Sequence, residues 1–200
     1  MNTIFRTRQR LVPCALALLL ILPLGLSPAG AFAASRETAA KATVEPADAG
    51  KTLKTAQAAL DKGDYPAVIG LLTPLAEAGN AEALYVLGRL RLEGKGVKKN
   101  EQRAAQLFSQ AAEKGDISAQ NAWATALARG QGTRRNYTEA ARWFRKAAEQ
   151  GLAEAQYNLG YLYAHGRGVK KDENAALDWY GRAANQGLAD AQANLEQLMG

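Results

Sequence analysis

Apolar residues recur at intervals of three and four positions through most of residues 51–199. This spacing is typical of α-helices that bury one face. In the segment 81–93, for example, Leu84, Leu87 and Leu90 fall on one face. Alanine dominates the 48% of residues that are hydrophobic, and it favours helix because it loses no side-chain entropy there. The pattern therefore predicts an all-α fold.

The apolar pattern repeats with a period of 36 residues. Glycines recur at this interval, at Gly79, Gly115, Gly151 and Gly187. So do alanine pairs, at Ala111-Ala112, Ala147-Ala148 and Ala183-Ala184. The period predicts three full repeats, each of a first helix (A) and a second helix (B), at 81–116, 117–152 and 153–188. A degenerate first unit (51–80) and a capping helix (189–200) complete the predicted repeat domain, 51–200.

A loop with two glycines separates helix A from helix B in each full repeat. In the first copy, Gly94 ends helix A in the left-handed conformation and Gly96 permits a second bend. The polar residue before each helix B is predicted to cap it; these residues are Asn100, Asn136 and Asp172. Three copies favour a structural turn over a phosphate-binding loop, which is usually present once per domain.

A helix pair of this size cannot bury its apolar stripe alone, so neighbouring pairs must stack into a solenoid. The large aromatic residues that recur within the pairs are expected in the core. Trp123, Trp143 and Trp179 are therefore predicted to face inward rather than to form a ligand-stacking cage.

The first 33 residues have the pattern of a secretory signal peptide. Three arginines precede an apolar run from Leu11 to Leu26, and Ala31-Phe32-Ala33 fits a cleavage site. Cleavage after Ala33 predicts a periplasmic or secreted protein whose residues 34–50 form a flexible leader. The alternative is that the apolar run is retained as a membrane anchor, although it is short for a membrane span.

Cleavage would change the charge and remove the single cysteine. The net charge would fall from +6 to +3, because residues 1–33 contain three arginines and no acidic residue. Such a small charge argues against nucleic acid as a partner. Cys14 would leave with the signal peptide, so the exported chain would have no disulfide and must be stabilised by packing.

The residues after the signal peptide do not form a recognisable catalytic set. His165 is the single histidine, and neither an HExxH motif nor a His/Cys ligand set is present. We therefore expect no enzymatic activity, no metal site and no cofactor.

The repeated residues resemble the Sel-1-like repeat, a relative of the tetratricopeptide repeat. The third copy carries the resemblance most fully, through Leu159-Gly160, Tyr163, Gly166, Gly168, Val169, Asp172, Ala176, Trp179-Tyr180, Ala183-Ala184 and Gly187. The middle copy departs from it, with Trp123-Ala124 in place of Leu-Gly and Thr133 in place of Val.

The resemblance implies a right-handed α-solenoid that acts as a non-enzymatic adaptor or scaffold for a protein partner in the bacterial envelope. Some cysteine-rich secreted members of the family are linked to β-lactam binding or hydrolysis. Their paired cysteines have no counterpart after residue 33 of this chain. A β-lactam or cell-wall hydrolase is therefore the weakest of the functions considered.

Because the A-helices of tetratricopeptide-like stacks line the concave face, the resemblance predicts the partner site there. The predicted partner-binding residues are Glu82, Arg89, Glu93, Asn121, Thr125, Arg129, Asn158, Tyr161 and His165. Tyrosine and arginine are enriched at binding hot spots, and asparagine can both donate to and accept from a peptide backbone. Tyr85 and Tyr157 fit either this surface or the packing between repeats.

The loops between helices A and B concentrate positive charge on one predicted edge. The residues are Lys98, Lys99, Arg134, Arg135, Lys170 and Lys171. An alternative function is therefore the binding of an anionic polysaccharide or a membrane surface through these loops. The simpler interpretation is that the lysines and arginines are solvated turn residues that maintain solubility.

Overall fold

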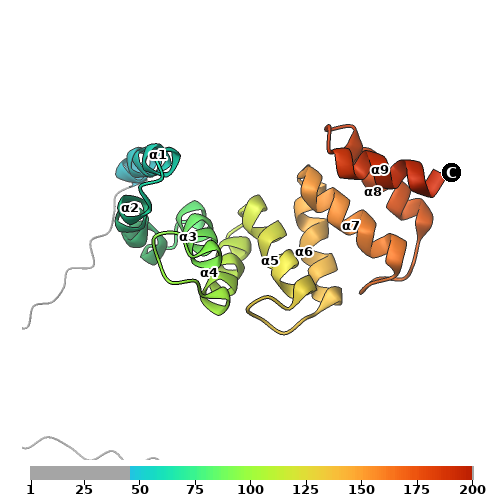
Figure 1. Cartoon of the computed structure of the whole chain (residues 1–200), viewed down its shortest axis with the longest axis horizontal. Helices are drawn as coiled ribbons and strands as arrows, with labels where there is room; N and C mark the ends of the chain where they lie inside the picture. The colour runs from blue at the N-terminus through green and yellow to red at the C-terminus, as the bar shows by residue number, and fades with distance from the viewer. Residues whose placement is uncertain (1–45, 200) are drawn as a thin grey trace, which may run out of the picture. The chain divides into compact units, whose positions relative to one another are not determined.

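The structure, a computed structural model, describes residues 46–199. The predicted signal peptide and most of the predicted leader lie outside this range. Within it the chain forms nine helices and no strand (Figure 1). Their bounds are Pro46–Asp61 (α1), Tyr65–Glu77 (α2), Ala81–Glu93 (α3), Glu101–Glu113 (α4), Ile117–Arg129 (α5), Tyr137–Glu149 (α6), Ala153–His165 (α7), Glu173–Ala184 (α8) and Ala189–Met199 (α9).

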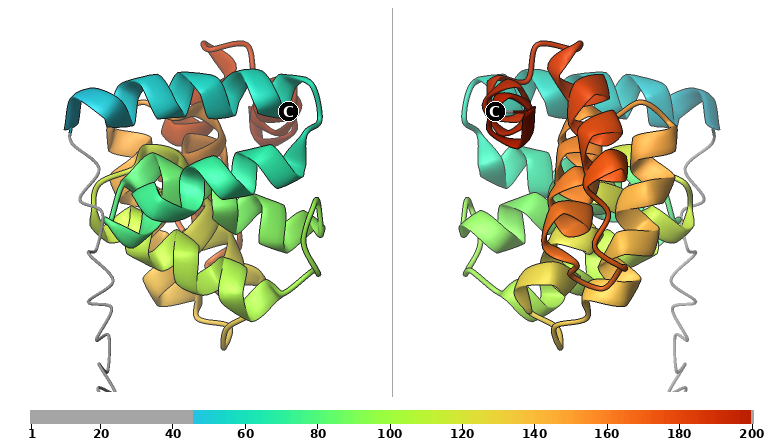
Figure 2. Two further views of the ribbon diagram at one scale, coloured as in Figure 1. Left: turned by 90° about the vertical axis from the view of Figure 1, so that its left-hand side faces the viewer. Right: turned by 90° about the vertical axis from the view of Figure 1, so that its right-hand side faces the viewer.

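Each helix packs mainly against the helices that precede and follow it in the chain. The A-helices of the full repeats are α3, α5 and α7, and the B-helices are α4, α6 and α8. The end-on views show the helix direction turning from one pair to the next (Figure 2). The all-α solenoid predicted from the sequence is confirmed, because successive pairs cover one another along the chain.

The first helix begins earlier than predicted. The sequence placed a flexible leader up to residue 50, whereas α1 begins at Pro46. Ala49 and Leu53 pack against a cluster that contains the buried Ala56. The sequence did not reveal this turn because residues 46–50 contain a proline, a glycine and two small alanines, and one apolar contact from Ala49 is too weak a signal to read from periodicity.

The core consists of aromatic side chains packed against glycine and alanine. Phe108, Phe144 and Tyr180 occupy the same position in successive B-helices and are 3%, 3% and 1% exposed. A Cβ added to Gly88 would lie 2.7 Å from the Phe108 ring, so glycine is needed at this crossing. The middle repeat has the buried Ala124 at the position of Gly88. Small residues thus allow the A- and B-helices to approach closely.

The tryptophans lie at the margin of the core instead of inside it. Trp123, Trp143 and Trp179 are half-buried and pack against the buried cluster of the second and third repeats. The Lys146 ammonium lies 4.1 Å from the Trp143 ring centroid. The prediction that the tryptophans face inward is therefore only partly correct, because each side chain packs against the buried cluster but stays partly exposed.

The loop between helices A and B forms as the sequence predicts. Gly94, Gly130 and Gly166 have φ values of 73°, 72° and 63° and end the A-helices. The predicted caps are confirmed: Asn100, Asn136 and Asp172 accept hydrogen bonds from backbone N–H groups in the first turn of the B-helices, at 2.8, 3.1 and 3.0 Å. The first glycine of each loop thus ends helix A, and the polar residue at the end of the loop caps helix B.

The second glycine of each loop makes a contact between repeats that the sequence did not predict. A Cβ on Gly132 would overlap the backbone of Glu101, the first residue of α4. A Cβ on Gly168 would likewise overlap the backbone of Tyr137, the first residue of α6. Each loop thus lies directly on the start of the preceding B-helix, so it fixes the spacing of neighbouring repeats.

No helix between residues 46 and 199 is both long enough and apolar enough to span a membrane.

Candidate partner-binding surfaces

The predicted partner-binding residues of the first full repeat lie on the exposed face of α3. Glu82, Arg89 and Glu93 are all exposed. Arg89 lies 3.5 Å from the Glu93 carboxylate, and Lys95 lies 2.8 Å from it. The hydrogen bond from Lys95, with the charge of Arg89, lowers the pKa of Glu93 below its ordinary value. The end of α3 therefore presents a linked group of charges instead of isolated ones.

A small hollow of about 170 Å³ lies between the A-helices of the first two full repeats. Tyr85 and Arg89 from α3 and Thr125 from α5 contribute to its wall. The remaining lining residues are Leu92, Glu101, Ala105, Phe108, Ala122, Ala126 and Gln131. The structure thus brings together Arg89 and Thr125, two of the predicted partner-binding residues. The sequence did not reveal the hollow, because it depends on how two repeats meet.

The two predicted asparagines contact each other across the repeat boundary. The Asn158 side-chain amide donates to the Asn121 side-chain oxygen at 3.1 Å. Thr125 donates to the backbone oxygen of Asn121 at 2.8 Å. All three side chains are half-buried. The remaining amide hydrogens and lone pairs of the asparagine pair leave capacity for a ligand.

The A-helix of the third repeat ends in an aromatic and basic group. The rings of Tyr161 and His165 lie 4.1 Å apart, and His165 Nδ1 lies 2.9 Å from the Tyr161 backbone oxygen. The Arg167 guanidinium lies 5.2 Å from the Tyr161 ring centroid. Tyr161 is half-buried and His165 is exposed. Arg129, at the end of α5, is also exposed.

Tyr85 and Tyr157 are partly exposed and also take part in packing, so both roles that the sequence left open apply to them. Each is half-buried and packs beside a core aromatic ring, Tyr85 at 6.0 Å from Phe108 and Tyr157 at 5.6 Å from Tyr180. The Tyr157 hydroxyl accepts a hydrogen bond from Asn194 at 3.3 Å. Tyr85 also lines the hollow between the A-helices, so it is the better candidate for contact with a partner.

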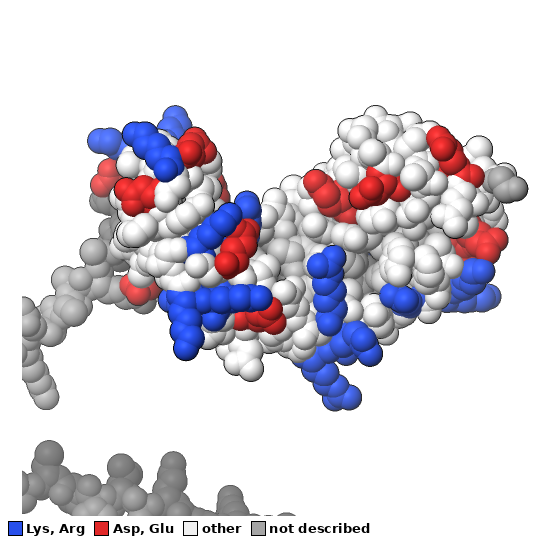
Figure 3. Space-filling view, in the orientation of Figure 1, with Lys and Arg blue, Asp and Glu red and all other residues white. Residues whose placement is uncertain are grey.

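The basic loop residues are all exposed, and lysines and arginines are visible along the loop edge (Figure 3). Two of them are paired locally: Lys99 lies 2.9 Å from Glu101, and Lys171 lies 2.7 Å from Glu173. Hydrogen bonds from Lys99 and Gln131 lower the pKa of Glu101. These acidic partners, at the starts of the B-helices, reduce the positive charge available to an anionic polymer.

Comparison with known proteins identifies the repeat. The sequence model of the Sel1 repeat matches residues 81–116, 117–152 and 153–188. The chain belongs to the Sel1 repeat family. Proteins built from Sel1 repeats generally act in protein–protein interaction as non-enzymatic scaffolds. A comparison with curated protein sequences gives no match.

Two solved structures support the same Sel1 architecture. A Sel1 repeat protein from Oxalobacter formigenes is 32% identical with a TM-score of 0.67, over 71% of this chain and 58% of that one. A protective antigen present in uropathogenic Escherichia coli strains is 30% identical with a TM-score of 0.64, over 72% of this chain and 34% of that one. This Sel1 chain therefore corresponds to about a third to three-fifths of the length of these relatives.

The part of this Sel1 stack that the structure describes contains no group of three or more His, Cys, Asp or Glu side chains placed to hold a metal ion. His165 contacts Tyr161 and is not seen to contact an acidic or nucleophilic side chain in residues 46–199.

Proposed function

We propose that this protein is an exported scaffold that binds a segment of a partner protein along the A-helix face of α3, α5 and α7. The observation that carries the proposal is the hollow between α3 and α5, where an apolar floor is bordered by Arg89 and Thr125. A preformed site of this kind limits the entropy lost when the partner is ordered.

The hollow suits one apolar side chain of the partner. Its floor is formed by Phe108 and alanines of α4 and α5, and its volume is about 170 Å³. Arg89 at its border could pair with an acidic residue next to the inserted side chain, a common arrangement at binding hot spots. The charge of Glu93 close to Arg89 would favour a partner segment that carries both signs of charge.

The neighbouring polar groups suit the backbone of the same segment. Asn121, Thr125 and Asn158 follow one another from the second to the third repeat and are already joined by hydrogen bonds. Their free donors and acceptors can pair with peptide N–H and C=O groups, which repeat along any extended chain. Tyr161 and Arg167 would extend the contact toward the end of α7.

An envelope location is the second part of the proposal. The basic, apolar and small-residue pattern of residues 1–33 supports export. The similarity to a protective antigen of uropathogenic Escherichia coli strains is consistent with it. Removal of the signal peptide after Ala33 is part of the same proposal, and the mass of the protein purified from the envelope would test it.

Site-directed photo-crosslinking in cells tests the proposed face. A photo-reactive amino acid in place of Arg89 should yield a discrete crosslinked protein, and the same group in place of the exposed Gln106 on α4 serves as the matched control. Ala122→Arg, which places a long charged side chain in the hollow, should remove the crosslink while the helical circular dichroism is kept. An equal crosslink from both positions, or one that survives Ala122→Arg, would contradict the proposal.

A further inference from the structure

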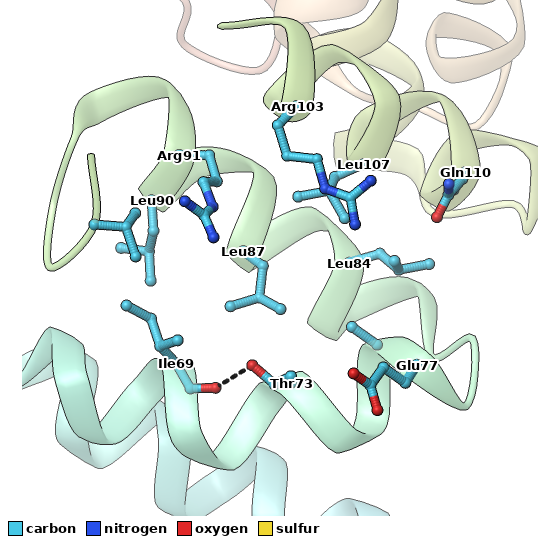
Figure 4. A pocket seen from close by; sticks show the side chains of 12 residues that line it. Ile69, Thr73, Glu77, Leu84, Leu87, Leu90, Arg91, Arg103, Leu107 and Gln110 are labelled. Carbon is cyan, nitrogen blue, oxygen red and sulfur yellow. Dashed lines mark hydrogen bonds between the residues drawn. The ribbon is translucent and has the colours of Figure 1, made fainter. Parts of the chain in front are cut away.

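A second cavity lies on the other side of α3, between α2 and α4. Its volume is about 310 Å³. Its apolar wall is formed by Ile69, Leu84, Leu87, Leu90, Val97 and Leu107. Figure 4 shows Ile69 and the four leucines with Arg91, Arg103 and Glu77 around the same space. The cavity shares no lining residue with the hollow on the A-helix face, so it is a separate feature of the molecule.

The corresponding position in the next repeat is lined by larger, aromatic side chains. At 36 residues from Leu87 and Leu107 the chain has Trp123 and Trp143, which pack against the neighbouring core clusters. In the third repeat, Trp179 again takes the place of Leu107. An indole is much larger than the side chain of leucine. Hollows also border Trp123 in the second repeat, so the first repeat differs from it in the aliphatic side chains that line this space and not in having an opening.

The charged side chains in the wall of the cavity also differ from those at the corresponding positions of the second repeat. Arg91 and Arg103 lie in its wall, and the corresponding positions in the second repeat are Leu127 and Glu139. Within residues 46–199 neither arginine forms an ion pair, and the hydrogen bond found for the Arg103 side chain goes to Gln106 at 3.2 Å. Each guanidinium has five N–H donors, so both retain donors for a ligand.

The geometry points to a binding site for a small monocarboxylate with an apolar body, such as an aryl-alkanoic acid. The apolar body would lie among the leucines. Arg91 and Arg103 would hold the carboxylate, because a guanidinium fork matches the two oxygens of that group. A volume of about 310 Å³ falls at the small end of the range for ligand sites.

Glu77 and Thr73 restrict what the site can accept. The Thr73 hydroxyl already donates to the Ile69 backbone oxygen at 2.7 Å. Glu77 adds a negative charge to the wall of the cavity, on the α2 side. A second carboxylate on the ligand would be repelled by Glu77, so a dicarboxylate of similar size should bind more weakly than the monocarboxylate.

Methyl NMR of the purified protein with labelled leucines tests the inference. The probe is 3-phenylpropionate, compared with its uncharged amide, 3-phenylpropanamide. Saturable shifts should appear for the methyl groups of Leu84, Leu87 and Leu107, and not for Leu159. The amide should bind at least about tenfold more weakly, because hydrogen bonds between charged groups contribute more than neutral ones.

Three variants locate the probe. Leu87→Trp, which reproduces the side chain of the next repeat, should abolish the shifts while the Leu159 signal shows that the stack is folded. The double change Arg91→Gln and Arg103→Gln should weaken binding at least about tenfold. Arg142→Gln, an exposed arginine of α6, should leave it unchanged.

The inference is overturned if no saturable shift is seen, or if binding survives in Leu87→Trp. Equal binding of the amide would also overturn it and would assign the cavity to an uncharged apolar group.

Discussion

The two connections in each repeat both depend on glycine, but for different physical reasons. In the loop from helix A to helix B, Gly132 lies against the backbone of Glu101 in the preceding repeat, where a Cβ cannot fit. In the turn from helix B to the next helix A, Gly151 has a φ of 94° and no atom within 4 Å of a Cβ position. Recurrence at one period therefore does not reveal whether a glycine is required by its neighbours or by its own backbone.

The two connections also join neighbouring repeats in different ways. The loop from A to B is held by close backbone contact. The turn from B to A is linked to its neighbours by glutamine side chains, as Gln186 donates to the Gly151 backbone oxygen at 3.0 Å and to Gln156 at 2.8 Å. Long side chains can adjust to a displacement, whereas a carbonyl group in van der Waals contact cannot. The loop from helix A to helix B should therefore tolerate substitutions much less well than the turn from helix B to helix A.

The largest effect is expected for Gly132→Ala. The new Cβ would overlap the first turn of α4 and would also be held at positive φ. Overpacking and backbone strain together should reduce the free energy of unfolding by about 3 kcal/mol or more. Urea unfolding followed by circular dichroism measures this, and a loss below about 1 kcal/mol would show that the loop can move away from α4.

Gly151→Ala is the matched change in the other turn. It meets no neighbouring atom, so its cost is the left-handed backbone of a residue with a Cβ, about 1–2 kcal/mol. The same urea experiment measures it. If Gly151→Ala destabilised the protein as much as Gly132→Ala, the distinction between the two connections would be lost.

Asn136→Ala tests the cap that follows the loop. Its side chain accepts a hydrogen bond from the Glu139 backbone N–H at 3.1 Å, at the start of α6. Loss of such a cap typically costs about 1 kcal/mol. Thermal unfolding should show a small decrease in Tm, and Asn136→Asp, which keeps an acceptor, should restore most of it.

The smallest effect is expected for Lys99→Gln. Lys99 holds the pKa of Glu101 below its ordinary value, so the pair favours the folded state at neutral pH and loses this contribution as the pH falls through the lowered pKa of Glu101. The variant should move the Glu101 pKa back toward its usual value with little change in stability. Carboxyl NMR titration measures the pKa, and an unchanged value would assign the shift to Gln131 instead.

Much of the fold could be predicted because the sequence signals are local and repeated. The helix period, the glycine that ends each A-helix and the caps at Asn100, Asn136 and Asp172 all act within a few residues of one another. Three copies at one interval strengthened each signal. The aromatic and alanine core followed for the same reason, since its members keep their register in every repeat.

The candidate sites were harder to predict because they depend on contacts between repeats. The hydrogen bond from Asn158 to Asn121 joins residues 37 positions apart, and no local sequence pattern predicts it. Neither does the hollow beside Tyr85, which needs the angle between two helix pairs. The half-exposed tryptophans show the same limit, since residue type indicated burial but could not show how much of each ring the next repeat would cover.

Because each helix packs mainly against its sequence neighbours, opening the stack at one end breaks a single interface at a time. Amide hydrogen exchange should therefore be slowest in residues 117–152 and faster toward both ends of the stack. The outermost hairpins can therefore open while the central repeats stay folded.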